Sequence, residues 1–416
     1  MIKKIIFSVG ILFATVASAQ QNAGSPYSFY GLGDQKFIGT NEHRAMGGLS
    51  VIGDSIHINL NNPASYADIA LTTFSIGASN TAYGLKSFQG SEKINRTSLD
   101  YLAIALPVAK NVGVSFGLMP VTTVGYKIQS SGTYNDLVQS MQYSGSGGLN
   151  KVYLGVGYKV MKGLSLGADM QYYFGSSEAK TLLATYDVQY ISRSVNIDEN
   201  RGLAFNFGAM YQTKIKDFDW HSSVSFAPQA NILSTHDRKI ATVQLGADGS
   251  EYTVEQRKID LEDSKFKLPA SYSVGTSFGK LYKWMIGAQA TFAQPKELIQ
   301  GSGITNLRYT NSNRFTLGGY YVPKYNSFSS YFNRVTYRAG FRVEDTGMII
   351  NDKKINDMAV SAGVGLPLGL SFSNLNLGFE YGSRGTQSAG LIKENYFMIT
   401  VGLSFNDRWF QKVKYY

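Results

Sequence analysis

Hydrophobic and polar positions alternate along most of this chain, from Phe74 to Phe405. Fourteen successive segments carry an apolar residue at every second position, and the residues between are mostly Gly, Ser, Thr, Asn, Gln or charged. Because successive side chains of a strand point to opposite faces, each segment predicts a strand with one apolar and one polar face. The clearest examples are 152–160, 270–278, 358–366 and 397–405.

Such a long series of two-faced strands favours a closed sheet. A soluble β-sandwich also alternates, but closing about fourteen strands into a barrel removes every unpaired edge. Segments of about ten residues with this alternation are typical of transmembrane barrels, whose apolar face meets lipid. The pattern therefore predicts an all-β protein, with residues 68–405 forming a 14-stranded antiparallel transmembrane β-barrel.

The connections between these segments alternate in length. Those after even-numbered segments are mostly short, and those after odd-numbered segments are mostly long, including 129–148, 176–201, 233–268 and 294–313. Outer-membrane barrels have short periplasmic turns and long extracellular loops. An even strand count then places both termini in the periplasm. Within the first long loop, Asp136–Met141 predicts one short helix.

The first 19 residues have the pattern of a secretory signal peptide. Lys3 and Lys4 form a basic start, Ile5–Val16 an apolar stretch, and Ala17–Ala19 a small-residue cleavage site. The mature chain would then begin at Gln20. No run of about 18 apolar residues follows, which excludes helical membrane spans. Export and the strand pattern together predict the outer membrane of a Gram-negative cell.

Composition narrows the choice of partners. The formal net charge of +10 is spread along the chain without a Lys/Arg block, so no nucleic-acid partner is expected. Anionic groups of outer-membrane lipid and lipopolysaccharide suit these basic residues better. The chain has no cysteine, and therefore no disulfide and no lipid-bearing cysteine after the signal.

Nothing in the sequence predicts catalysis, a metal site or a cofactor. The four histidines are scattered, without the spacing of metal ligands, and no local hydrolase signature is present. We therefore expect a protein that is not an enzyme.

One stretch, Arg44–Ala67, has no clean strand or helix period. Because an even barrel leaves the N-terminus at the periplasmic end, this stretch must enter the lumen from below or hang beneath it. Its distinctive residues are Gly47, Gly48, Asn61, Asn62, Pro63 and Ala64.

Three parts of the chain resemble the FadL-type family of outer-membrane transporters for hydrophobic compounds, in a form typical of the Bacteroidota. They are Gly47-Gly48 with Asn62-Pro63-Ala64, then Lys267–Phe292, and then Arg314–Gly347. The resemblance implies an N-terminal hatch, residues 20–67, that plugs the lumen. It also implies a lateral opening at a kink in the third strand, and hydrophobic small molecules as cargo.

Pro120 interrupts the third segment and suits such an opening. It cannot donate a hydrogen bond to a neighbouring strand, and Gly117 and Met119 come just before it. The alternative is a plain β-bulge at the rim, and both interpretations stay open.

By parity, five charged residues point into the lumen: Arg314, Arg338, Arg342, Asp169 and Glu380. The arginines suit two roles. One is to hold the carboxylate of a fatty acid or another anionic cargo, since arginine binds carboxylates bidentately. The other is an ion-pair network that fixes the hatch to the wall, which we favour because buried charges need partners.

Two functions of different classes follow. The first is passive uptake of hydrophobic compounds such as long-chain fatty acids, through a lumen plugged by the hatch. The second is a non-transporting barrel subunit of a multiprotein outer-membrane machine, for protein secretion or outer-membrane protein assembly. The charged loop 233–268 and the aromatic tail 406–416 favour the second, with other outer-membrane proteins as partners. A third function, an open diffusion porin, is opposed by the hatch.

Overall fold

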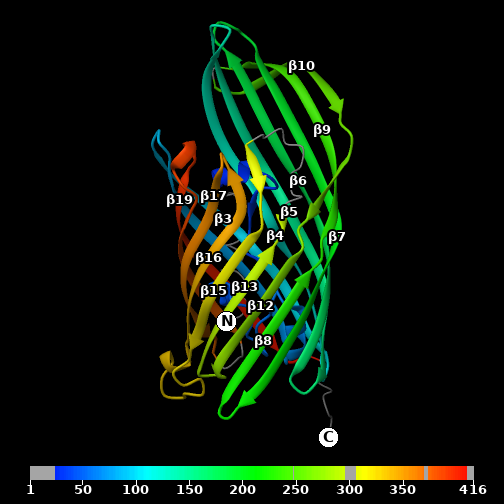
Figure 1. Ribbon diagram of the computed structural model, residues 1–416, viewed down its shortest axis with the longest axis vertical. Coiled ribbons are helices and arrows are strands. Elements are labelled where there is room, and N and C mark those ends of the chain that lie inside the picture. Colours follow the sequence, from blue (N-terminus) through cyan, green and yellow to red (C-terminus); the bar gives the residue numbers. More distant parts are fainter. Residues whose placement is uncertain (1–23, 247, 296–305, 370–372, 410–416) are drawn as a thin grey trace.

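The computed structural model describes residues 24–246, 248–295, 306–369 and 373–409. These residues form a closed antiparallel β-barrel of fourteen strands, which confirms the predicted fold (Figure 1). No helix in these ranges has the length and apolarity needed to cross a membrane. The predicted signal peptide, 1–19, and most of the predicted tail, 410–416, lie outside the described residues.

Each wall strand pairs with its neighbours, and the last strand closes the barrel on the first. β19 lies along the whole of β2, from Asp407↔Thr72 to Lys393↔Lys86. Two wall strands are broken at prolines, Pro228 between β8 and β9 and Pro269 between β11 and β12, because proline cannot donate to the sheet. In chain order the wall consists of β2 (Thr72–Lys86), β3 (Ser91–Ala109), β4 (Val112–Tyr134), β5 (Leu137–Met161), β6 (Leu164–Thr185), β7 (Ile191–Ile215), β8 with β9 (Phe218–Ala227, Ala230–Leu245), β10 with β11 and β12 (Glu251–Asp260, Ser264–Leu268, Ser271–Lys280), β13 (Trp284–Ala293), β15 (Ser312–Tyr321), β16 (Thr336–Ile350), β17 (Lys353–Pro367), β18 (Asn374–Arg384) and β19 (Lys393–Asp407).

The two faces of the wall follow the alternation in the sequence. On β5, Leu154 and Val156 on the outside are 53% and 45% exposed, whereas Lys151 and Tyr153 on the inside are buried. The outer band of apolar side chains is the surface that a transmembrane barrel presents to lipid.

Four strands are far longer than a membrane crossing requires. β4 to β7 have 22 to 25 residues, against the roughly 10 residues that cross a bilayer. With β9 and β10 they rise above the rest of the barrel on one side, a feature that we call the tall wall (Figure 1). The opposite end, which holds turns such as 110–111 and 162–163, is called the short-turn end.

The tall wall corrects two expectations about loops. Segments 129–148, 176–201 and 233–268 are mostly strand, and Asp136–Met141 belongs to the β4–β5 hairpin instead of forming a helix. The hairpin turns at Asn135 and Asp136, which both have positive φ, as a tight hairpin turn requires.

The N-terminal segment, residues 24–71, packs against the inside of the wall, and most of it is buried. α2 contacts β17 to β19, η3 contacts β3 to β7, and β1 pairs with β4, so the segment joins separate sectors of the barrel. Its elements are η2 (Pro26–Phe29), β1 (Asp34–Gln35), α2 (Asn41–Arg44) and η3 (Pro63–Asp68). The remaining short elements, outside this segment, are β14 (Leu307–Tyr309), η5 (Phe332–Arg334) and η6 (Ser388–Gly390).

Candidate functional site

The glycine pair lies at a close contact between the N-terminal segment and the wall. Gly47 and Gly48 have φ of 72° and 96°, a region that favours glycine. Opposite them, a Cβ added at Gly340 of β16 would lie within 3.0 Å of the Gly47 nitrogen and the Met46 carbonyl. Gly47 also donates its N–H to Ser361 Oγ at 2.9 Å. Glycine on both sides therefore lets the two backbones touch.

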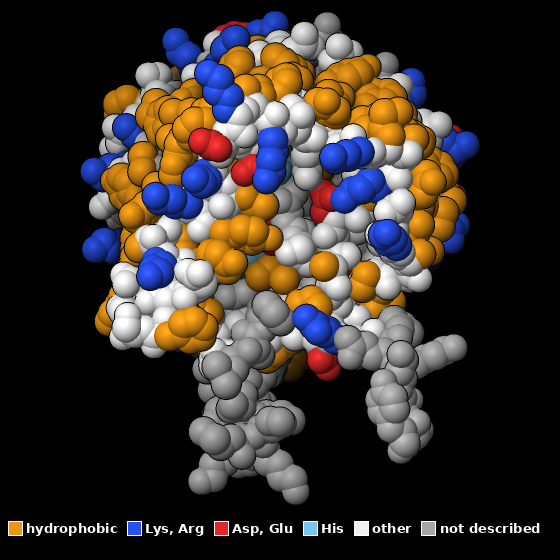
Figure 2. All heavy atoms as spheres, turned by 90° about the horizontal axis from the view of Figure 1, so that it is seen from below, with side chains coloured by type: hydrophobic (Ala, Val, Ile, Leu, Met, Phe, Trp, Pro, Cys, Tyr) orange, Lys and Arg blue, Asp and Glu red, His pale blue; other side chains and the backbone are white. Residues whose placement is uncertain are grey.

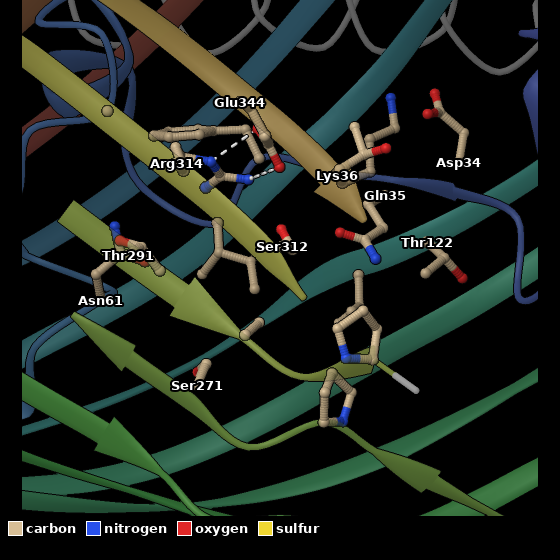
Figure 3. Close-up of a pocket in the computed structure, with 18 of the residues that line it drawn as sticks. Asp34, Gln35, Lys36, Asn61, Thr122, Ser271, Thr291, Ser312, Arg314 and Glu344 are labelled. Carbon is tan, nitrogen blue, oxygen red and sulfur yellow. Dashed lines mark hydrogen bonds and ion pairs between the residues drawn. The ribbon is translucent and has the colours of Figure 1, made fainter. Parts of the chain in front are cut away.

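Asn62, Pro63 and Ala64 pack against the wall. Asn62 and Ala64 are only 1% and 0% exposed. The Asn62 amide donates to Ser223 Oγ at 2.8 Å, and its Oδ1 accepts the Ala64 N–H at 3.0 Å, which caps η3. Asn61, in contrast, lines the central cavity (Figure 3). Of these residues, only Asn61 is in a position to meet a molecule in that cavity.

Glu380 joins the N-terminal segment to the wall. Its Oε2 accepts from Arg44 Nε at 3.1 Å, and its Oε1 accepts from Arg342 Nη2 at 3.2 Å. Arg342 also donates to the Tyr396 hydroxyl at 3.0 Å and lies 3.3 Å from Asp357 Oδ2. Glu380 and Arg342, both predicted to face the lumen, are thus brought together in one buried network.

Arg338 and Arg314 have different surroundings. Arg338 Nη1 donates to Asn376 Oδ1 at 3.0 Å, and Asn376 in turn donates to Glu42 of the N-terminal segment at 2.6 Å. Arg314 makes a bidentate pair with Glu344, at 2.8 and 2.9 Å, on the wall of the central cavity (Figure 3). These bonds link Arg338 to the N-terminal segment through Asn376, whereas they link Arg314 only to Glu344 of the wall.

Asp169 lies on β6, apart from the arginines. Its carboxylate accepts from Gln171 at 2.5 Å and from Asn206 at 3.0 Å. Asn206 also donates to the Asn61 carbonyl at 3.3 Å. Asp169, which was predicted to face the lumen, is therefore linked through Asn206 to Asn61 of the N-terminal segment.

A further anchoring site, around Arg384, was missed by the sequence analysis. Arg384 donates to Asp34 at 2.6 Å and to Glu394 at 2.7 Å, and its guanidinium lies over the Tyr27 ring. The signal was available, because Arg384 shares the parity of Glu380 on β18 and must face the same way.

Two cavities flank the N-terminal segment. The central cavity has a volume of about 410 Å³, and burial there lowers the pKa of the Lys36 ammonium to about 8. Its lining mixes apolar side chains with hydroxyl, amide and charged groups, among them Asp34, Gln35, Lys36, Asn61, Thr122, Ser271, Thr291, Ser312, Arg314 and Glu344 (Figure 3).

The second cavity, of about 1320 Å³, lies at the short-turn end. Among its lining residues, His57 Nδ1 is 2.5 Å from Asp54, and His57 Nε2 is 3.8 Å from Glu42. Burial opposes charge on Asp54, but the adjacent His57 outweighs burial and lowers the pKa of this carboxyl to about 2. No group of three or more His, Asp or Glu side chains suited to a metal ion occurs in the part of the chain that the structure describes.

The two edges of β4 are paired differently around Pro120. On one edge, pairing with β5 continues through a bulge between Pro120 and Thr122. On the other edge, pairing with β3 ends at Leu118, and β1 pairs from Thr122 onward. Gly117 and Met119 lie beside this change of partner, and Met119 is buried. Beyond Leu118, β1 of the N-terminal segment takes the place of β3 along this edge of β4. The edge is therefore covered in the structure, and the lateral opening stays a prediction.

Comparison with known proteins adds a family and a fold. A family model described as BamG matches residues 1–416, whereas no curated protein matches the chain. Among solved structures, the toluene transporter TbuX of Ralstonia pickettii is 14% identical with a TM-score of 0.57, covering 89% of this chain and 99% of its own. The toluene transporter TodX of Pseudomonas putida is also 14% identical, with a TM-score of 0.57 and coverage of 91% and 100%. At this identity the likeness shows a shared fold alone.

Proposed function

The chain belongs to the BamG family, and we propose that it is a non-transporting barrel subunit of a multiprotein outer-membrane machine, for outer-membrane protein assembly or protein secretion. The observation that carries this proposal is the double anchoring of the N-terminal segment. Glu380 binds Arg44 at one site, and Arg384 binds Asp34 at the other. Separating buried pairs leaves uncompensated charges, so the segment is suited to seal the barrel permanently. The family name also hints at other outer-membrane proteins as partners.

In this proposal, residues 20–67 are a hatch and residues 68–405 are the wall around it. Residues 1–19 are the export signal, 406–416 are a periplasmic C-terminal tail, and both ends of the mature chain lie in the periplasm. The outer band of apolar side chains contacts membrane lipid and lipopolysaccharide.

The chemistry of the central cavity supports the same function. A pocket for an apolar molecule is lined mostly by apolar and aromatic side chains, with few polar groups. Here the paired charges of Arg314 and Glu344 and the ammonium of Lys36 share the lining with several hydroxyls and amides. Such a lining places more polar and charged groups along the chain of a fatty acid than a pocket of that kind does.

The second candidate is passive uptake of a hydrophobic compound such as a long-chain fatty acid. The fold shared with the toluene transporters and the departure of β3 from β4 beyond Leu118 favour it. Cargo would then leave sideways near Gly117, Met119 and Pro120, and a lumen arginine would hold its carboxylate.

Purification from native membranes in mild detergent tests the first candidate. We expect other outer-membrane proteins to co-purify in stoichiometric amounts, and a protein that purifies alone would contradict the proposal. Uptake of a labelled long-chain fatty acid should be equal in deletion and parent strains. Loss of uptake on deletion would favour the transporter instead.

A disulfide between β1 and β4 separates the two candidates further. Gln35 and Thr122 are register partners, and the chain has no other cysteine, so Gln35→Cys with Thr122→Cys should form one defined bond. We expect co-purification to be unchanged whether this bond is oxidised or reduced. If the segment must move for transport, fatty-acid uptake falls on oxidation and returns on reduction. Each single cysteine variant serves as the control.

A further inference from the structure

The short-turn end of the barrel is strongly basic. In the part of the chain that the structure describes, ten cationic side chains lie there with the carboxylates of Asp68, Asp217, Asp219 and Asp407. Two further carboxylates, Glu42 and Asp54, line the cavity and flank His57. Among these cations only Lys159 has an ion pair with a described residue, Asp68 at 2.8 Å. The basic ring consists of Lys110, Lys159, Lys162, Lys214, Lys216, Lys280, Lys283, Lys324, Arg334 and Arg408.

Part of this basic ring surrounds the cavity at the short-turn end. Seen from below, Lys and Arg side chains lie around a hollow, with acidic side chains among them at its edge (Figure 2). Five members of the ring line the cavity, and Lys159 among them pairs with Asp68. We call the other four the mouth cations: Lys162, Lys214, Arg334 and Arg408. The outer cations, Lys110, Lys216, Lys280 and Lys283, are equally numerous and do not line it.

One mouth cation lacks a full set of partners. Arg334 Nε is buried without a hydrogen-bond partner among the described residues, although its guanidinium lies 5.5 Å from the Tyr331 ring centroid. A buried guanidinium nitrogen without an acceptor costs free energy unless a further group supplies one. Carboxylates are the natural acceptors for arginine, because they can accept two of its N–H groups at once.

The position of the mouth cations decides between two kinds of anionic partner. Lipid headgroups lie around the outer perimeter of a barrel, level with the ends of its apolar band. The mouth cations line the central hollow instead, where a bilayer leaflet does not reach. A polypeptide segment is able to enter such a hollow, and its acidic side chains would complement the ring.

We infer that the mouth at the short-turn end is a docking site for an acidic segment of a periplasmic protein. The inference rests on the proposed function and on its assignment of this end to the periplasm. The segment would present Asp or Glu carboxylates to Lys162, Lys214, Arg334 and Arg408 from below. The outer cations would contribute long-range attraction, which salt screens within about 10 Å at 0.1 M.

The test uses the full-length protein in detergent micelles and a fluorescent twelve-residue peptide of alternating Glu and Gly. Fluorescence anisotropy should show binding that weakens with salt. Replacing all four mouth cations (K162Q, K214Q, R334Q and R408Q) should weaken binding by about tenfold or more, because several ion pairs are lost. The matched control, K110Q with K216Q, K280Q and K283Q, removes the same charge and should weaken binding by less than about threefold. Equal losses in the two variants would overturn the inference, as would no binding by the parent.

A lipid-binding outcome is measured separately. Purified protein is placed in nanodiscs with and without phosphatidylglycerol, and the peptide titration is repeated. Peptide binding that phosphatidylglycerol abolishes would assign the mouth to lipid and overturn the inference. Heat-modifiable migration in gels confirms that each variant is folded, and the single substitutions K162Q and R408Q replace any quadruple variant that is not.

Co-purification distinguishes failure of this inference from failure of the proposed function. If the parent protein carries stoichiometric partners and the mouth variant loses one of them while the control variant keeps it, both stand. If both variants keep every partner, the docking site is wrong and the function is unaffected. If the parent purifies alone, the proposed function fails, whatever the peptide titration shows.

Discussion

At the scale of single residues, Glu380 has the largest expected effect on stability. It is 3% exposed and lies between Arg44 and Arg342, so Glu380→Gln leaves the buried Arg44 guanidinium without its carboxylate and leaves Arg342 with Asp357 alone. Breaking a buried pair in this way costs about 3–5 kcal/mol. We expect a clear fall in the urea midpoint of the folded barrel, measured by tryptophan fluorescence in detergent. The exposed Lys258, which pairs with Asp237, is the control, because an exposed ion pair contributes little and Lys258→Gln should leave the midpoint nearly unchanged.

The same comparison bears on the two roles considered for the lumen arginines. Arg342→Ala should lower the heat resistance of the barrel while leaving fatty-acid uptake unchanged, since Arg342 already has three partners. Uptake lost from a barrel of normal heat resistance would instead indicate that the arginine grips cargo.

His57 should make stability depend on pH. Burial alone would lower its pKa, but Asp54 at 2.5 Å and Glu42 at 3.8 Å raise it above the ordinary value of about 6.5. The charged form therefore contributes stability that is fully present below about pH 6.5 and is lost as pH rises through the folded pKa. His43, whose pKa burial lowers to about 4, affects only the range below about pH 6.5.

The measurement is the melting temperature of the detergent-solubilised barrel between pH 6.5 and 8, because above about pH 8 the lowered pKa of Lys36 raises stability with pH and opposes the effect of His57. The parent should melt at a lower temperature as pH rises, and His57→Gln should flatten that slope because it removes the titrating group. Asp54→Asn should shift the fall to lower pH. A slope that is the same in the parent and in His57→Gln would contradict the assignment to His57.

At the scale of elements, the contact between the N-terminal segment and β16 depends on the absence of a side chain. A Cβ at Gly340 would lie within 3.0 Å of backbone atoms of Met46 and Gly47, which have no flexible end that can turn away. Gly340→Ala should therefore cost about 1–3 kcal/mol and loosen the segment. Limited trypsin digestion at Lys36 and Arg44 detects the loosening. Gly132→Ala on β4 is the control, because a Cβ there meets nothing within 4 Å.

The strands of the barrel differ in how far the sequence pattern predicts them. The wall within the membrane was predictable, because lipid outside and a packed lumen inside impose opposite polarity on alternate positions. The tall wall was not, because a strand with water on both faces needs no such alternation. The residues at 129–148 are therefore mostly Ser, Gly and Gln, which sequence patterns assign to loops.

At the anchoring sites, the residues of the wall were predictable from the sequence, but their partners in the N-terminal segment were not. Parity on a strand assigns Glu380 and Arg342 to the lumen, and the same parity assigns Arg384 once β18 is extended past Tyr381. Their partners in the N-terminal segment, such as Arg44 and Asp34, lie in a stretch without a period. Only tertiary packing decides where those side chains point.

At the scale of the whole molecule, the barrel has two unlike ends, and its orientation is open to a direct test. If the short-turn end is periplasmic, the tall wall stands outside the cell. A cysteine at Asp187, in the turn between β6 and β7, should then react with a membrane-impermeant maleimide in intact cells. A cysteine at Lys162, in the turn between β5 and β6, should react only after the outer membrane is permeabilised. Because the chain has no native cysteine, each signal reports one position. The reverse labelling pattern would put the basic ring outside the cell, where a periplasmic acidic segment cannot reach it, and would remove both the docking site and the assignment of the hatch to the periplasmic side.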